Sequence, residues 1–195
     1  MKTTCSCLPF FVAAALCGSL FAQEAAPPAA KAAEKLYAFR TSSGFYLTAE
    51  NGGGSVVNTD RKELGPWETF TMVQTAPGVF AFRTEDGHFL SDSVFERPRR
   101  GGRPQQQQQQ MASARGGLVA TQTNSDGSAQ FKLMVVNPEG PIVVLVTSAG
   151  KYVTAENSGG MKARSSRAMA TDRAEIGDWE LFTLVDVEKF RAGAK

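Results

Sequence analysis

The sequence has few of the residues that cross-link a small protein or give it catalytic chemistry. Its three cysteines, Cys5, Cys7 and Cys17, lie near the N-terminus, so the rest of the chain has neither a thiol nor a disulfide. The one histidine, His88, follows a turn-like Asp-Gly pair, and we expect it at the surface. These residues are too few for a zinc site or a catalytic triad. We therefore expect no catalytic residue, no metal, no cofactor and no enzymatic activity.

The sequence also has little net charge of either sign and no long apolar run. The formal net charge is only +2, which gives no overall attraction to nucleic acid or an anionic membrane. The main apolar run, Leu8 to Leu16, is shorter than the roughly 20 residues of a membrane span. Lys2 precedes it and small residues up to Ala22 follow, which predicts a signal peptide over residues 1–22. A membrane anchor is the alternative; we expect export to the periplasm or the exterior, with no membrane span after cleavage.

Residues 23–35 are rich in alanine and proline and contain no large apolar side chain, which is typical of a linker. From Leu36 onward, short runs of β-branched and aromatic residues alternate with Gly, Asn, Asp and Pro, which is the pattern of an all-β domain. Only the tail from Val185 to Lys195 has the composition of a helical turn, and frayed chain ends are the alternative. The sequence therefore predicts one all-β domain over residues 36–186, followed by a tail at 187–195.

One passage occurs almost twice. Residues 39–73 read FRTSSGFYLTAENGGGSVVNTDRKELGPWETFTMV, and residues 145–185 read LVTSAGKYVTAENSGGMKARSSRAMATDRAEIGDWELFTLV. A third copy opens at 81–91 with AFRTEDGHFLS, and the segment 97–116 is an insertion in it. Three copies, at about 36–77, 78–138 and 139–186, indicate a fold built from one repeated unit.

Each copy offers four strand candidates. They are 35–41, 45–49, 55–58 and 67–73; 79–84, 88–91, 118–121 and 129–136; and 142–147, 151–155, 161–164 and 179–185. Twelve strands in three units predict a β-trefoil with pseudo-threefold symmetry, in which three hairpins close one end of a six-stranded barrel. A three-bladed propeller is the alternative, although propellers usually have at least four blades.

The recurring residues have structural roles in this fold. Gly44, Gly87 and Gly150 follow two small or polar residues and are expected at positive φ in tight turns. The expected barrel core is one apolar and one phenylalanine position per copy: Leu47, Leu90, Val153, Phe70, Phe131 and Phe182. The aromatic residues Tyr46, Phe89 and Tyr152 are expected to pack on the other face. Glu68 and Glu180, which follow Trp67 and Trp179, are expected to accept hydrogen bonds from backbone N–H groups of neighbouring repeats.

The motif T-x-x-G-K-Y-[LV]-T-A-E-N, followed by glycines, a basic stretch and G-x-W-E-x-F, resembles the repeat of fascin-like β-trefoil domains, the actin-crosslinking superfamily. The likeness covers residues 36–186 and weakens in the middle copy, where Ser128 and Ala129 replace Trp-Glu. The resemblance implies the fold, while trefoils of this type serve actin bundling, sugar binding or protein interaction. The Q-x-W repeat of ricin-type lectins is absent.

Two regions are candidates for ligand binding. The near-identical loops AENGGG and AENSGG place polar groups beside an aromatic residue, which suits a carbohydrate, although such sequences are also ordinary turns. These residues are Glu50, Asn51, Tyr46, Glu156, Asn157 and Tyr152. The insertion 97–116 frames six glutamines with arginines and is expected to be disordered. It could attract polyanions, and a surface insertion that binds no ligand is the alternative. Its arginines are Arg97, Arg99, Arg100, Arg103 and Arg115.

The sequence thus predicts a secreted, non-enzymatic binding module for carbohydrate or another cell-surface component. A protein-interaction module of the inhibitor or adhesion type is the alternative, and actin binding ranks below both because bundling joins several trefoils in one chain. The insertion has no aromatic residue to stack on bases, which argues against nucleic acid as a partner.

Overall fold

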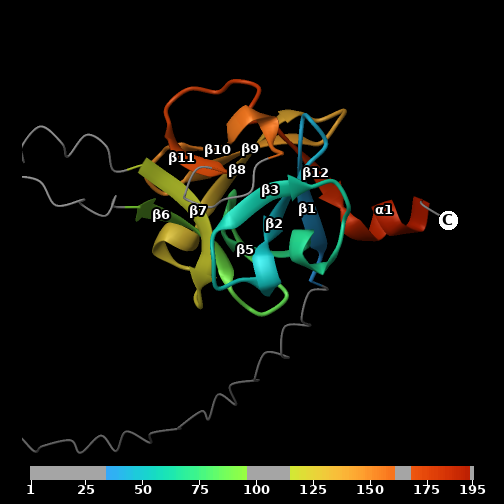
Figure 1. Ribbon diagram of the computed structural model, residues 1–195, viewed down its shortest axis with the longest axis horizontal. Helices are drawn as coiled ribbons and strands as arrows, with labels where there is room; N and C mark the ends of the chain where they lie inside the picture. The colour runs from blue at the N-terminus through green and yellow to red at the C-terminus, as the bar shows by residue number, and fades with distance from the viewer. Residues whose placement is uncertain (1–33, 96–114, 161–167, 194–195) are drawn as a thin grey trace, which may run out of the picture. The chain divides into compact units, whose positions relative to one another are not determined.

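The computed structural model describes residues 34–95, 115–160 and 168–193, which belong to one compact unit that begins at Ala33 (Figure 1). The predicted signal peptide, nearly all of the linker and most of the insertion lie outside the described residues. Side chains are described within these ranges except at positions 94, 95 and 115.

The described chain is almost entirely β. The strands are β1 (Leu36–Thr41), β2 (Tyr46–Ala49), β3 (Val57–Arg61), β4 (Phe70–Ala76), β5 (Val79–Arg83), β6 (Phe89–Phe95), β7 (Arg115–Gln122), β8 (Phe131–Asn137), β9 (Ile142–Thr147), β10 (Tyr152–Ala155), β11 (Met169–Arg173) and β12 (Phe182–Asp186). One helix, α1 (Val187–Gly193), follows the last strand. No helix among the described residues is long and apolar enough to cross a membrane.

Six strands close into a barrel. Antiparallel pairs run from β1 to β4, β5, β8, β9, β12 and back to β1, so the six strands close into a complete ring. The closing pair joins the first and last strands, with Tyr37 opposite Asp186 and Thr41 opposite Phe182. The other six strands form the hairpins β2–β3, β6–β7 and β10–β11.

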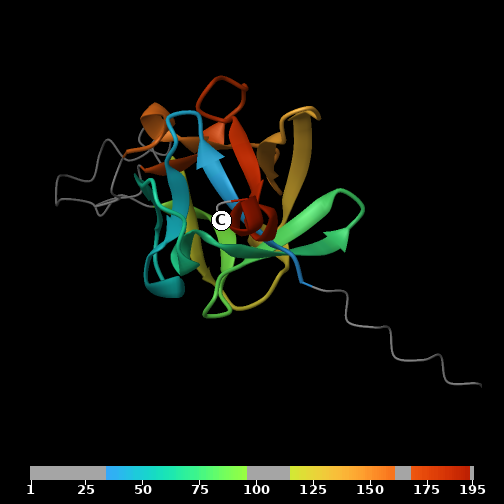
Figure 2. The same ribbon diagram turned by 90° about the vertical axis from the view of Figure 1, so that its right-hand side faces the viewer.

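These three hairpins meet one another. Ala170 of β11 pairs with Gly117 of β7, and Val56, just before β3, pairs with Val119 of β7. Figures 1 and 2 show them gathered at one side of the barrel, as the predicted fold requires. The Gly160 N–H also donates to the Thr59 carbonyl, which links the third copy to the first.

Four predicted strands are displaced. Those predicted at 67–73 and 179–185 begin three residues later, at Phe70 and Phe182, because Trp67 and Trp179 lie in the turns that precede them. The second strand of the first hairpin is β3 at Val57–Arg61 rather than 55–58. In the third copy the partner of β10 is β11 at Met169–Arg173, while the predicted 161–164 lies outside the described residues. In both copies a glycine-rich turn precedes the strand by several residues. Each strand ends with the sequence Thr-Asp-Arg.

The barrel core is aromatic and fully enclosed. Phe39, Phe82 and Phe182 are all 0% exposed, and the Phe39 and Phe82 rings meet edge to face with centroids 4.9 Å apart. The six positions expected inside the barrel, Leu47, Leu90, Val153, Phe70, Phe131 and Phe182, are each at most 1% exposed. Burial of one such side chain contributes about 1.5–3 kcal/mol, so this layer supplies a large share of the stability that disulfides provide elsewhere.

The turn glycines carry the expected conformation. Gly44, Gly87 and Gly150 have φ values of 85°, 85° and 74°, in the left-handed region that side chains disfavour. In each copy the threonine three residues earlier caps this turn by accepting the N–H of the residue after the glycine, as Thr41 Oγ1 does for Phe45 at 3.1 Å.

Candidate ligand-binding site

The two AEN loops are tight turns. In η1 (Glu50–Gly52) and η6 (Glu156–Ser158), Asn51 and Asn157 both have φ of 55°, a conformation that asparagine tolerates better than most residues. Both asparagines are exposed. Their backbone role accounts for their recurrence, so recurrence alone does not indicate a ligand.

In the first copy the loop glutamate belongs to a cluster built on Trp67. Glu50 accepts hydrogen bonds from Asn58 Nδ2 at 3.1 Å and from Arg61 Nη2 at 3.0 Å. The Arg61 guanidinium lies over the Trp67 ring, 4.6 Å from its centroid. Arg61 Nη1 is also 3.8 Å from Glu68 Oε1, so this one arginine bridges two carboxylates and covers the indole.

Glu68 is buried at 2% exposure because it holds the turn before β4. Its Oε2 accepts the Gly65 N–H at 2.9 Å, and a Cβ at Gly65 would lie 2.9 Å from the same oxygen. In the third copy, Glu180 Oε2 accepts the Gly177 N–H at 2.7 Å. The expected backbone donors are present, but they come from the glutamate's own repeat rather than from neighbouring ones.

The third copy repeats this cluster in a looser form. Arg173 Nη2 is 3.4 Å from Glu156 Oε1, and its guanidinium lies 5.7 Å from the centroid of Trp179. Glu180 Oε1 accepts a hydrogen bond from the Thr154 hydroxyl at 2.7 Å. Among the described contacts, Arg173 pairs with Glu156 and not with Glu180, so it does not span the cluster as Arg61 does.

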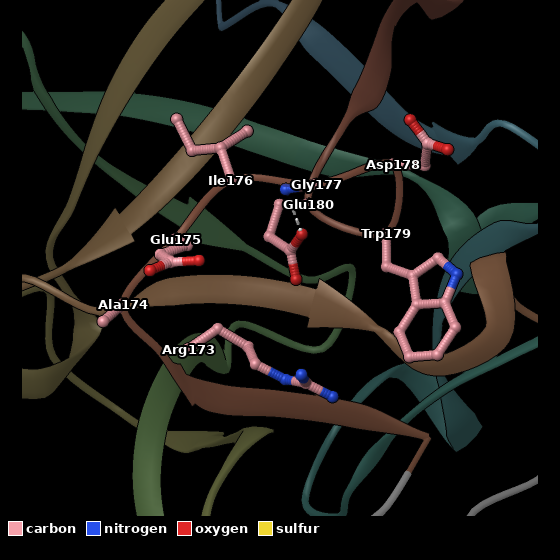
Figure 3. A pocket seen from close by; sticks show the side chains of 8 residues that line it. All are labelled: Arg173, Ala174, Glu175, Ile176, Gly177, Asp178, Trp179 and Glu180. Carbon is pink, nitrogen blue, oxygen red and sulfur yellow. Dashed lines mark hydrogen bonds between the residues drawn. The ribbon is translucent and has the colours of Figure 1, made fainter.

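A hollow of about 460 Å³ opens beside this looser cluster (Figure 3). It is lined by the segment between β11 and β12: Arg173, Ala174, Glu175, Ile176, Gly177, Asp178, Trp179 and Glu180. Figure 3 shows the Arg173 side chain extending below Glu180 toward the indole of Trp179. Glu175, Ile176 and Asp178 are exposed, and Trp179 is half-buried. This third-copy hollow combines an aromatic face with several hydrogen-bonding groups.

The middle copy has lost the whole cluster. Phe89 pairs with Gln122 in the same register in which Tyr46 pairs with Arg61 and Tyr152 with Arg173. By that register the glutamate, arginine, tryptophan and buried glutamate are replaced by Ser93, Gln122, Ser128 and Ala129. All four positions differ in the middle copy, so the described cluster occurs in the first and third copies alone.

Of the two predicted aromatic platforms, Tyr46 is buried, whereas Tyr152 is half-buried, as both tryptophans are. Tyr46 is 3% exposed and packs with Ala38 and Val187, so its ring offers no surface to a sugar. Of the predicted ligand residues, Glu156 reaches the third-copy hollow through Arg173, whereas Glu50 is held in the covered cluster of the first copy.

The predicted polyanion residues Arg97, Arg99, Arg100 and Arg103 lie outside the described residues. Arg115 begins β7, opposite Phe95 of β6, so the expected insertion 97–116 overlaps the start of a strand. The strands β6 and β7 therefore continue up to the insertion and bring its two ends side by side.

Two arginines and two tryptophans form the clusters, and none of them was predicted as a binding residue. They are Arg61, Arg173, Trp67 and Trp179. A signal for them exists, since Thr-Asp-Arg stands six residues before Trp-Glu in both complete copies. Within the described residues no group of three or more potential metal ligands is found.

Comparison with known proteins identifies the architecture. ThreeFoil, a designed three-fold symmetric protein, matches with a TM-score of 0.55 at 19% identity, over 77% of this chain and 98% of its own. The chain is a β-trefoil. No protein-family model matches the sequence, and no curated protein matches it.

Natural β-trefoil relatives in structure differ widely in role. The Macrolepiota procera ricin B-like lectin, solved in complex with lactose, matches with a TM-score of 0.51 at 10% identity, over 77% of this chain and 94% of the lectin. The Haemophilus ducreyi cytolethal distending toxin matches with a TM-score of 0.52 at 12% identity, over 78% and 83%. At these identities the likeness extends to the fold alone.

Proposed function

We propose that this β-trefoil is an exported, non-enzymatic module that binds carbohydrate in the third-copy hollow, with the ring of Trp179 as the stacking platform. The observation that carries the proposal is the difference between two otherwise equivalent tryptophans. Both indoles are half-buried, but Trp67 lies under an arginine 4.6 Å away that contacts two carboxylates, whereas the arginine near Trp179 is 5.7 Å away and the ring borders a hollow of about 460 Å³.

A pyranose ring offers an apolar face and a hydroxyl edge, and sugar sites pair an aromatic ring with nearby polar groups. Glu175 and Asp178 supply exposed carboxylates on the same turn as Trp179. Arg173, whose side chain is 48% exposed, adds a donor that remains anchored by Glu156. The equivalent turn in the first copy has Pro66 in place of Asp178, which removes one of these hydrogen-bonding groups.

The fold supports this proposal, because the lactose-bound lectin shares it. The fascin-like kinship is part of the proposal too, on the strength of the repeat motif in the first and third copies. Protein interaction is the second candidate, favoured by the exposed apolar side chains of Met134, Val135 and Val136 in β8. Actin binding and polyanion binding through the insertion rank lower. The module needs no catalytic role, since Glu68 and Glu180 belong to separate repeats and each holds its own turn.

Tryptophan fluorescence tests the site directly, because the chain has only two tryptophans. In a Trp67→Phe variant Trp179 is the sole indole, and in Trp179→Phe it is Trp67. A glycan array on the chain from Gln23 onward first selects a ligand. We then expect that ligand to change the emission of the Trp67→Phe protein in a saturable way and to leave the Trp179→Phe protein unaffected.

Truncation of the platform gives the matched comparison. Stacking of a nucleic-acid base on an aromatic side chain is of the order of 1–3 kcal/mol. If the face of a sugar stacks comparably on Trp179, Trp179→Ala should weaken binding about fivefold or more. Trp67→Ala removes the same side chain from the covered cluster and should leave affinity within about twofold. Absence of binding to any glycan at high protein concentration, or equal loss in both variants, would contradict the proposal.

Export is tested on the protein made by a bacterium carrying the full-length sequence. We expect the protein recovered outside the cytoplasm to begin at Gln23, as read by mass spectrometry of its N-terminal peptide. An intact N-terminus on cytoplasmic protein would contradict this part of the proposal.

A further inference from the structure

The turn between β11 and β12 carries more negative charge than its counterpart in the first copy. The two turns align without a gap, as RKELGPWE at 61–68 and RAEIGDWE at 173–180. The charge differs at two of these positions, because Lys62 and Pro66 of the first copy are replaced by alanine and by Asp178 in the third. The first-copy turn therefore has two cations and two carboxylates, whereas the third-copy turn has one cation and three carboxylates.

Ion pairing increases this difference. In the first copy Arg61 contacts both Glu50 and the buried Glu68, so the buried carboxylate has a cation beside it. Among the described ion pairs of the third copy, Arg173 contacts Glu156, which lies outside the turn. The one cation of the third-copy turn is therefore neutralised by a carboxylate from elsewhere.

Three carboxylates that line the third-copy hollow have no cationic partner among the described residues: Glu175, Asp178 and Glu180. Glu180, at 5% exposure, accepts hydrogen bonds from the Gly177 N–H and the Thr154 hydroxyl. Both donors are neutral and leave its negative charge in place, and burial weakens the screening of that charge by salt. The hollow thus combines a negative potential with an indole ring, and both of these attract a cation.

We propose that the carbohydrate bound in the third-copy hollow is an amino sugar with a free, protonated amine, as in a chain of 2-amino-2-deoxyhexose units. This inference rests on the carbohydrate function proposed above and names its substrate class. The apolar face of the pyranose lies against Trp179, and the ammonium group donates charge-assisted hydrogen bonds to a carboxylate. An N-acetylated sugar lacks this charge, and the carboxylates repel a sugar acid.

The places of the two exposed carboxylates suit a chain of sugars better than a single one. In the view of Figure 3, Asp178 lies on the same side of Glu180 as the indole of Trp179, and Glu175 lies on the opposite side. A chain with one amine on each ring can bring an ammonium group to both exposed carboxylates. The volume of about 460 Å³ is within the range of roughly 300–1,000 Å³ that is usual for small-molecule sites.

Paired oligosaccharides test this inference on the chain from Gln23 onward. Titration calorimetry compares oligomers of β-1,4-linked glucosamine with their N-acetylated counterparts at about pH 6, where the amine is protonated and carboxylates are ionised. We expect the amino oligomer to bind at least about tenfold more tightly, as two exposed ion pairs allow. This preference should shrink as salt is raised from about 0.05 M to about 0.5 M. A lysine oligopeptide with the same number of amines has no pyranose face for Trp179 and should bind more weakly than the amino oligomer.

Asp178→Asn keeps the shape of the side chain and removes one charge. It should weaken binding of the amino oligomer about fivefold and leave that of the N-acetylated oligomer within about twofold. Glu63→Gln is the matched control, because it removes an exposed carboxylate from the first-copy turn and changes the net charge equally. It should leave the affinity for both oligomers unchanged.

The outcomes separate this inference from the function on which it rests. If the N-acetylated oligomer binds as tightly as the amino oligomer, or if Asp178→Asn and Glu63→Gln act alike, the amine preference is wrong while binding of sugar at Trp179 stands. If no sugar binds, or if binding is unchanged in Trp179→Ala, both proposals are wrong. Equally tight binding of the lysine oligopeptide would assign the hollow to basic peptides and would overturn the inference as well.

Discussion

At the scale of single residues, one hydroxyl distinguishes the two tryptophan clusters, whose indoles are both half-buried. The Thr154 hydroxyl donates to Glu180, whereas the equivalent Thr48 hydroxyl donates at 3.4 Å to the backbone carbonyl of Tyr46. Glu68 therefore has an oxygen for Arg61, and that arginine is held over its indole. Glu180 has its oxygens occupied, and Arg173 stays with Glu156.

Removal of the buried Glu180 should lower stability. In Glu180→Ala the Gly177 N–H and the Thr154 hydroxyl lose their acceptor inside a site that is 5% exposed, which should reduce the free energy of unfolding by about 1–3 kcal/mol. Urea unfolding followed by fluorescence measures the change. The exposed Glu175→Ala on the same turn is the control, with an expected change within about 0.5 kcal/mol.

Two adjacent glycines should respond differently to alanine. Gly53 and Gly54 both have positive φ, at 135° and 75°. A Cβ on Gly53 would lie 2.7 Å from His88 Nδ1, whereas nothing lies within 4 Å of one on Gly54. Gly54→Ala should cost about 1–2 kcal/mol of backbone strain, and Gly53→Ala distinctly more because His88 must also move. Equal unfolding midpoints in urea would refute this difference.

His88 also shows a limit of sequence reasoning at this scale. Its neighbours Asp86 and Gly87 predicted an exposed turn, and both are exposed. The imidazole itself is half-buried against Gly53 of the first copy, a contact between residues far apart in sequence. No local pattern records such an approach, whereas the positive φ of Gly87 follows from its turn alone.

At the scale of elements, the β6–β7 hairpin should tolerate loss of the insertion. Phe95 pairs with Arg115, so residues 96–114 join two adjacent antiparallel strand ends that a two-residue turn can connect. Replacement of 96–114 by Asn-Gly should keep the thermal midpoint within about 5 °C of wild type. Reduced retention on heparin would assign polyanion binding to the insertion, and unchanged retention would exclude it.

Helix α1 should contribute through one residue. Val187 is 0% exposed against Ala38 and Tyr46, while Phe190 on the same helix is 48% exposed. Val187→Ala should lower the free energy of unfolding by about 1–3 kcal/mol, and Phe190→Ala by less than about 0.5 kcal/mol. Chemical unfolding of the two variants measures both. A larger loss in Phe190→Ala would mean that the helix packs by its other face.

Sequence patterns predicted the number of strands better than their limits. Apolar alternation is strong in the barrel strands, and β9 (Ile142–Thr147) lies where it was expected. Apolar alternation is weak in β3 and β11, which both end in Thr-Asp-Arg. The threonine of each strand is buried, and the arginine lies over the tryptophan of its cluster. Polar residues depress the strand signal, so both predictions stopped at the wrong residues.

At the scale of the whole molecule, the pseudo-threefold frame separates fold from function. The buried core positions of the barrel recur in all three copies. The tryptophan cluster is tightly paired in the first copy, absent from the second, and looser and beside a hollow in the third. Repetition in the sequence therefore predicted the architecture, and the departures from repetition mark where the candidate sites lie. The hollow was not predictable, because it depends on which group donates a hydrogen bond to each buried glutamate.

Closure of the barrel should permit circular permutation. Because β1 and β12 are antiparallel neighbours, the two ends of the domain are adjacent, and β6 and β7 offer a second pair of adjacent ends. A chain that starts at Arg115, joins the original ends by a short glycine linker and stops at Phe95 should fold. Its near-ultraviolet circular dichroism should match wild type, and an unfolded product would contradict the closed arrangement.

The pairing of β1 with β12 also sets the timing of folding. During synthesis β1 emerges first and its partner last, so the barrel stays open at that seam until nearly the whole chain exists. A translocation channel that accepts only unfolded polypeptide could therefore act on the chain before the barrel closes. Under the export proposed above, late closure would keep the chain able to pass through such a channel until β12 has been made.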